Sequence, residues 1–223
     1  MSALICGSMA YDTIMVFHDK FKNHILPDKV HMLSVSFLVP ALRREYGGCA
    51  GNIAYNLNML DETPLMMATV GHDFEPYSQW LNQCGLSSQY LKILDDHYTA
   101  QAYITTDEDD NQITAFHPGA MNLSHLNQVP DDTDDIDIGI ISPDGKDGMK
   151  QHAQQFVDLD IPFIFDPGQG MPMFNGEELL KFIDQATWLT LNDYESQLMQ
   201  ERTGLSLERM AEKVEALIIT LGR

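Results

Sequence analysis

Residues 47–60, GGCAGNIAYNLNML, place three glycines directly before a polar amide and an apolar helical pattern. Gly47, Gly48 and Gly51 let a backbone approach a ligand closely, and they equally permit a tight turn with positive φ. Asn52, just inside the expected helix start, can hydrogen-bond a hydroxyl or cap the helix. We interpret this segment as the place where a small hydroxylated ligand meets the chain.

Asp12 follows an apolar strand pattern by a few residues. A carboxylate there can accept hydrogen bonds from two vicinal hydroxyls, as in ribose or another sugar; the alternatives are an Asx-turn or a surface charge. Polar or glycine residues follow four expected strands, where ligands of open parallel sheets bind, although loops after strands are commonly polar in any case. These strand ends are Gly7-Ser8, Asp166-Pro167-Gly168, Asn192 and Thr220-Leu221-Gly222.

The tetrapeptide NDYE, residues 192–195, has two interpretations. Asn192 followed three residues later by Glu195 matches a capping box, which needs no ligand. The same residues at a helix start can also serve a nucleotide phosphate and a hydrated magnesium ion. Glycine spacing excludes a P-loop at 139–146, and Gln112 and Pro118 exclude an EF-hand loop in the acidic segment between the two strands at 99–119.

The elements that position these residues alternate between strand and helix in the second half of the chain, which indicates βαβ units and a parallel sheet. The sequence therefore predicts an α/β fold with a doubly wound, mostly parallel sheet flanked by helices. Two β-rich segments, about 12–48 and 99–119, are expected to form a small β lid on this single domain, 1–223. Strands are expected at 3–8, 12–17, 31–40, 43–48, 64–71, 136–143, 161–168, 188–193 and 215–222, a hairpin at 99–119, and helices at 50–60, 74–85, 146–160, 175–187, 193–204 and 206–215.

The composition argues against several classes of function and partner. The 223 residues carry a formal net charge of -20, which argues against nucleic acid and against anionic membrane surfaces as partners. Three cysteines without a CxxC pair suggest reduced thiols and a cytoplasmic location. The first residues have no basic region and only a short apolar run, so we expect neither a signal peptide nor a membrane span.

Taken in order, the motifs GSMAYDTI, GGCAGNIAYNL, DPG, NDYE and ITLG, with the lid hairpin, resemble the ribokinase-like (PfkB) family of sugar and nucleoside kinases. SVSFLVP, REYGGCAGN and AFHPGAM are most similar to bacterial adenosine-kinase-type members. The resemblance implies that Asp12 and Asn52 hold sugar hydroxyls beside the backbone of Gly48, with Ser8 and Ser36 next to the substrate. It further implies that Phe116, or alternatively Phe37, stacks on a base or covers the sugar.

For the nucleotide, the resemblance implies that Asn192 and Glu195 serve the phosphates and Mg²⁺, with Glu195 acting through water, and that Thr220 and Gly222 open the ATP site. The implied reaction is ATP-dependent phosphorylation of the primary hydroxyl of a nucleoside or sugar. Adenosine is favoured over ribose or fructose, because an aromatic lid gains stacking energy from a flat base.

One departure from the family pattern concerns the chain end. Family members continue after the ITLG strand into a Gly-Ala/Cys-Gly-Asp segment that supplies an anion hole and the catalytic aspartate, and no such segment occurs in these 223 residues. The expectation is therefore a shortened, inactive form of such a kinase. The alternatives are a non-catalytic nucleoside- or sugar-binding or interaction protein, and a piece of a longer gene product. A homodimer through the lid strands is a further expectation.

Overall fold

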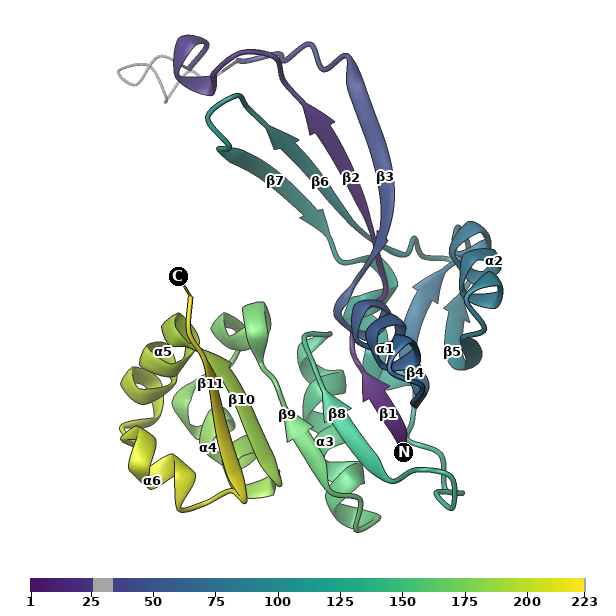
Figure 1. Cartoon of the computed structure of the whole chain (residues 1–223), viewed down its shortest axis with the longest axis vertical. Helices are drawn as coiled ribbons and strands as arrows, with labels where there is room; N and C mark the ends of the chain where they lie inside the picture. The colour runs from purple at the N-terminus through teal and green to yellow at the C-terminus, as the bar shows by residue number, and fades with distance from the viewer. Residues whose placement is uncertain (26–33, 223) are drawn as a thin grey trace.

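The computed structural model describes residues 1–25 and 34–222, which form two sheets (Figure 1). The larger sheet has seven parallel strands in the order β11-β10-β9-β8-β1-β4-β5. Their bounds are β1 Ser2–Cys6, β4 Thr63–Gly71, β5 Ser87–Leu94, β8 Ile138–Ile141, β9 Phe163–Phe165, β10 Trp188–Asn192 and β11 Ala216–Thr220. The predicted α/β class with a parallel sheet is confirmed.

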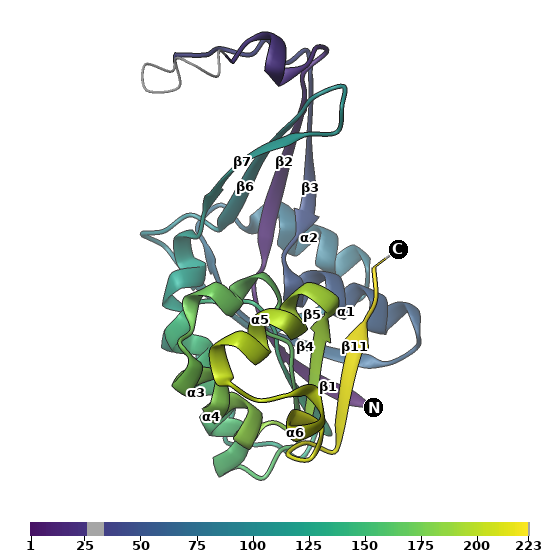
Figure 2. The ribbon, with the colours of Figure 1, turned by 90° about the vertical axis from the view of Figure 1, so that its left-hand side faces the viewer.

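Helices cover both faces of this sheet, which is what makes it doubly wound (Figure 2). Leu4 and Cys6 of β1 point into one core, which α3, α4 and α5 close, while Ile5 points into a second core beneath α1 and α2. The alternation of side chains along a strand produces this division, since both faces are buried and the strand is apolar throughout. The helices are α1 Cys49–Met59, α2 Glu75–Gln83, α3 Lys146–Asp158, α4 Gly176–Gln185, α5 Asp193–Thr203 and α6 Leu207–Ala211.

The second sheet, which we call the small sheet, has the order β3-β2-β6-β7 and stands beyond the carboxyl ends of the large-sheet strands (Figure 1). β2 pairs antiparallel with β3 and parallel with β6, and β6 pairs antiparallel with β7. Both segments expected to form a lid contribute to it. Its strands are β2 Ala10–Val16, β3 Ala41–Gly47, β6 Ala100–Thr106 and β7 Gln112–His117. The 3-10 helices within the described residues are η1 Phe21–Asn23, η3 Gly119–Leu126 and η4 Gly168–Met173.

The predicted strand at 31–40 is wrong for residues 34–40, which have no strand pairing; residues 31–33 lie outside the described residues. The apolar character of the segment serves another purpose, because the ring of Phe37 packs 4.8 Å from that of Phe17 and 5.0 Å from that of Phe21. Strand β5 was not predicted, since this edge strand is half polar. The last predicted helix, 206–215, is shorter and covers only Leu207–Ala211.

Candidate functional site

The large sheet changes direction between β1 and β8. The chain runs from β1 outward to β4 and β5 on one side, and from β8 outward to β9, β10 and β11 on the other. Open α/β sheets bind ligands at such a switch point, beyond the carboxyl ends of the strands. Here the two strand ends are joined directly, because the backbone N–H of Ser8 donates to the carbonyl of Pro143 over 3.0 Å.

The turn from β3 into α1 is pressed against the turn from β1 into β2. Gly48 has a φ of 92°, and a Cβ there would lie 2.5 Å from the carbonyl oxygen of Ser8. Only glycine fits both the backbone conformation and the close approach. The side chain of Ser8 is buried and accepts the N–H of Cys49 over 3.1 Å, so it satisfies one of the free donors at the start of α1. The structure thus gives Ser8 a capping role at the edge of the predicted site.

Asp12 and Asn52 are each attached to this turn, Asp12 through Gly47 and Asn52 through Gly48. A Cβ placed on Gly47 would lie 2.4 Å from Oδ2 of Asp12, so the carboxylate rests directly over the glycine. Asn52 lies in the first turn of α1, with an exposed side chain, and its N–H donates to Gly48 over 3.0 Å. Gly48 is the N-cap of α1, which excludes the capping role for Asn52, and Asp12 is paired in β2, which excludes an Asx-turn.

Acidic side chains surround this turn. Burial raises the pKa of the Cys49 thiol, and the carboxylates of Asp166, Asp144 and Asp12 raise it further, in that order. Burial also raises the pKa of Asp12, with a contribution from Glu45. The start of β2 and the carboxyl ends of β8 and β9 therefore bring carboxylates together around Cys49, although they come from distant parts of the sequence.

A second group of predicted residues gathers at the ends of β10 and β11. Asn192 is paired with Thr220 across these strands, and a Cβ on Gly222 would lie 3.5 Å from Oδ2 of Asp193. The capping box is present, since Asn192 Oδ1 accepts the N–H of Glu195 over 2.7 Å and Glu195 Oε2 accepts the N–H of Asn192 over 2.8 Å. β10 lies three strands from β1, which corresponds to about 14 Å across the sheet.

The fit to Mg²⁺ can be judged from the carboxylates near α5. Burial raises the pKa of Asp166 to about 6, and the neighbouring Glu195 is the second cause. Two carboxylates that interact electrostatically favour a cation between them. Among residues 1–25 and 34–222, no group of three His, Cys, Asp or Glu side chains is arranged to hold a metal. Asp166 and Glu195 match in number the one or two carboxylates that hold a magnesium ion which keeps most of its water shell.

The small sheet presents one face to the site. By the pairing register, Asp12 lies opposite Ala102, and Ala102 lies opposite Phe116, so all three share a face. Phe116 is about half exposed. Ser36 is exposed and Phe37 packs with Phe17 just past the far end of β2, about 16 Å along the strand from Asp12. The structure therefore brings Phe116 near Asp12 but leaves Ser36 and Phe37 apart from it.

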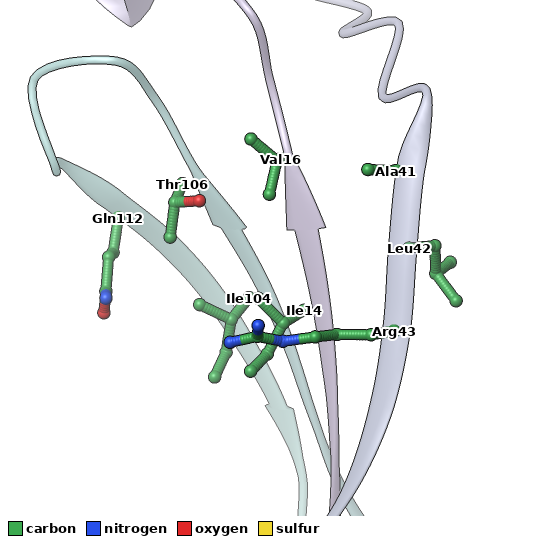
Figure 3. A pocket seen from close by; sticks show the side chains of 8 residues that line it. All are labelled: Ile14, Val16, Ala41, Leu42, Arg43, Ile104, Thr106 and Gln112. Carbon is green, nitrogen blue, oxygen red and sulfur yellow. The ribbon is translucent and has the colours of Figure 1, made fainter.

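Sequence reasoning missed a hollow on this same face of the small sheet (Figure 3). Its volume is about 380 Å³, and it begins one residue pair beyond Asp12. Ile14 and Ile104 form its floor, with the guanidinium of Arg43 extending across them. The alternation of Asp12, Ile14 and Val16 in β2 was the signal that could have identified this face. The remaining lining residues are Val16, Ala41, Leu42, Thr106 and Gln112.

The comparison with family models identifies the class of protein that has this fold. The chain belongs to the pfkB family of carbohydrate kinases, whose model matches residues 9–223. The nucleoside kinase of Burkholderia thailandensis, solved in complex with inosine, is 51% identical with a TM-score of 0.85; the match covers 98% of this chain and 69% of that one.

An archaeal nucleoside kinase is also similar to this chain. The nucleoside kinase of Methanocaldococcus jannaschii is 30% identical over 194 residues, which are 85% of this chain and 62% of the relative. Its structure superposes with a TM-score of 0.87 at 26% identity. The chain thus spans about 62% of the length of this curated relative. No helix in the described part of the chain is long and apolar enough to cross a membrane.

Proposed function

We propose that this chain carries the nucleoside-binding part of an ATP-dependent nucleoside kinase, with a purine nucleoside as the acceptor. The observation that supports this most directly is that Asp12 rests on Gly47 and Asn52 is hydrogen-bonded to Gly48, in one turn at the switch point below the small sheet. The Asp12 carboxylate accepts hydrogen bonds from vicinal ribose hydroxyls, and the exposed amide of Asn52 provides a further contact. The small sheet acts as the lid.

The base would lie in the hollow of the small sheet. The hollow begins two residues along β2 from Asp12, about 7 Å, so a base can reach it when the ribose hydroxyls contact Asp12. Ile14 and Ile104 offer apolar surface to a flat ring, Arg43 offers donors, and Phe116 stacks from β7. These features suit any purine and do not distinguish adenine from hypoxanthine. Adenosine, the substrate favoured by sequence, is therefore proposed together with inosine, which the Burkholderia relative binds.

The nucleotide would lie at the ends of β10 and β11. The N-terminus of α5 attracts phosphate through its dipole, and Thr220 and Gly222 flank it. Asp166 and Glu195 would hold a hydrated Mg²⁺, which neutralises developing charge during phosphoryl transfer. The span of about 14 Å between β1 and β10 accommodates the phosphates between the two ligands.

Calorimetry on this chain tests the nucleoside half directly. We expect inosine and adenosine to bind, with Asp12→Ala and Asn52→Ala each lowering the affinity at least tenfold. Asp96→Asn, which neutralises an exposed turn carboxylate, is the charge control and should bind as the unsubstituted chain does. If ribose or fructose binds more tightly than either nucleoside, the proposed substrate class is wrong.

ATP binding and turnover test the other half. An ADP-release assay with each nucleoside reports transfer, and Glu195→Gln should weaken the dependence on Mg²⁺. The complete capping box favours a second candidate, a nucleoside-binding protein without transfer activity, because Asn192 and Glu195 already satisfy each other. Nucleoside binding without ATP binding would support that candidate, and measurable turnover would exclude it.

We also propose that the small sheet mediates a homodimer. β7 is an edge strand whose residues are all exposed, including Ile113 at 44%, and such an edge readily pairs with another chain. Sedimentation velocity should show a dimer that Ile113→Lys dissociates. A monomer at all concentrations would refute this arrangement.

A further inference from the structure

The turn between β4 and α2 holds the base of the small sheet through one carboxylate. Asp73 Oδ1 accepts the N–H of Thr99 over 2.7 Å, and Oδ2 accepts the side-chain amide of Gln101 over 3.0 Å. The guanidinium of Arg44 lies 3.8 Å from Oδ2, and the hydroxyl of Tyr11 donates to the Asp73 carbonyl over 2.9 Å. Asp73, which follows strand β4 of the large sheet, therefore contacts β2, β3 and β6 of the small sheet.

These contacts lie on the face of the small sheet opposite the site. Tyr11, Arg44 and Gln101 alternate along their strands with Asp12, Glu45 and Ala102, and side chains of a strand alternate between faces. The Arg44 guanidinium lies 3.6 Å above the ring of Tyr11, which ties β3 to β2. The Asp73 side chain is 19% exposed, so its charge-assisted hydrogen bonds are partly shielded from water and stronger than surface ones.

The two halves of the proposed nucleoside site are carried by different sheets. Asp12 and Phe116 are carried by the small sheet, whereas Asn52 is carried by α1, which packs on the large sheet. The angle between the sheets therefore decides whether one nucleoside can touch all three side chains. Positioning groups of this kind matter because small displacements of a binding group are costly.

We propose that Asp73 is a positioning residue that sets the angle of the small sheet and thereby the nucleoside affinity. Asp73 does not touch the nucleoside; it acts through Thr99, Gln101 and Arg44 from the opposite face. This inference rests on the proposed function for its effect on affinity. Its effect on the angle of the sheet does not depend on the identity of the ligand.

The protein contains a reporter for this angle. Trp80 of α2 stacks on Tyr46 of β3, with ring centroids 5.1 Å apart and planes at 28°. The hydroxyl of Tyr46 also donates to the carbonyl of Pro76 over 3.2 Å. Because the only other tryptophan is Trp188, in β10, the Trp188→Phe chain reports the separation of the small sheet from α2 through Trp80 fluorescence.

The experiment compares three substitutions in the Trp188→Phe chain. Asp73→Asn removes the charge, Gln101→Leu removes one arm of the contact without changing charge, and Asp96→Asn is the charge-matched control on an exposed turn. We expect Asp73→Asn and Gln101→Leu to increase acrylamide quenching of Trp80. Inosine affinity should fall about tenfold with Asp73→Asn, which corresponds to one lost charge-assisted hydrogen bond. Asp96→Asn should change neither quantity.

Unchanged quenching in both Asp73→Asn and Gln101→Leu would overturn the proposal, as would increased quenching with unchanged inosine affinity. A lowered melting temperature without a change in quenching would show a merely structural role. If Asp73→Asn does not fold, acrylamide quenching of the Gln101→Leu chain tests the proposal alone. If the unsubstituted chain binds no nucleoside, the proposed function fails, and the quenching comparison still decides whether Asp73 sets the angle of the sheet.

Discussion

Gly47 offers the sharpest test of the nucleoside site. Gly47→Ala would place a methyl group 2.4 Å from Oδ2 and 3.0 Å from Cγ of Asp12. An ordinary contact needs about 3.4 Å, so the carboxylate must move by about 1 Å. The backbone itself tolerates alanine, because Gly47 is the last residue of strand β3. The substitution therefore displaces one functional group and leaves the fold in place.

The size of the effect follows from the hydrogen bonds that Asp12 would make. Each charge-assisted bond to a ribose hydroxyl is worth about 1.5–3 kcal/mol, and a displacement of about 1 Å weakens both without abolishing them. We expect inosine affinity to fall about 100-fold, or about 2.7 kcal/mol. The free energy of unfolding should change by less than about 1 kcal/mol, since glycine replacement also lowers the entropy of the unfolded chain.

Calorimetry on a double-mutant cycle separates this mechanism from a general disturbance. Once Asp12 is replaced by alanine, Gly47→Ala has no carboxylate to displace and should cost nothing further. A Gly47→Ala chain with full affinity would refute the reasoning. So would a loss of equal size in the Asp12→Ala background, because the methyl group would then act on something other than the carboxylate.

Further predictions concern stability and the base. In urea unfolding, Gly48→Ala should lower the free energy of unfolding by more than about 3 kcal/mol, because its Cβ would clash with the backbone of Ser8. Gly204 also has a positive φ but open space around it, so Gly204→Ala should lower the free energy of unfolding by only about 1–2 kcal/mol. Burial raises the pKa of Asp144 to about 8, so the folded chain binds a proton that the unfolded chain releases near pH 4, and stability falls as pH rises between these values. Asp144→Asn should therefore raise the melting temperature more at pH 8 than at pH 5; a constant difference would contradict this. Phe116→Ala should weaken inosine binding about tenfold and leave the melting temperature unchanged, because the ring is half exposed.

Much of the large sheet could be predicted because its strands and helices alternate with clear periods and stop signals. β5 could not, since Ser87–Leu94 lies at the edge and mixes polar and apolar residues without a clean alternation. The strand prediction for residues 34–40 was wrong because the apolar ring of Phe37 packs with Phe17 and Phe21 instead of lying in a sheet. Apolar character alone does not require a paired strand.

The candidate site also contains some residues that sequence could indicate and others that it could not. Asp12 and Asn52 could be selected as candidates from residue type and position, but their attachment to one turn depends on the close fit of Gly47 against Asp12 and of Gly48 against the backbone of Ser8. Asp73 could not be recognised, because an aspartate before a helix ordinarily indicates a turn. Its partners Thr99 and Gln101 lie 26 and 28 residues away, and only the pairing of the small sheet brings them together.

The pairing of β2 with β6 also has a consequence for the order in which the protein is made. Ala10 is hydrogen-bonded beside Ala100, so the first strand of the small sheet leaves the ribosome 90 residues before its neighbour. At synthesis rates of about 5–20 residues per second, β2 waits roughly 5–20 s for β6. Once β3 has been made, the two strands wait roughly 3–12 s as an isolated antiparallel pair, which is marginally stable in water. The carboxylate of Asp12 is thus among the earliest functional groups synthesised and among the later ones to reach its final surroundings.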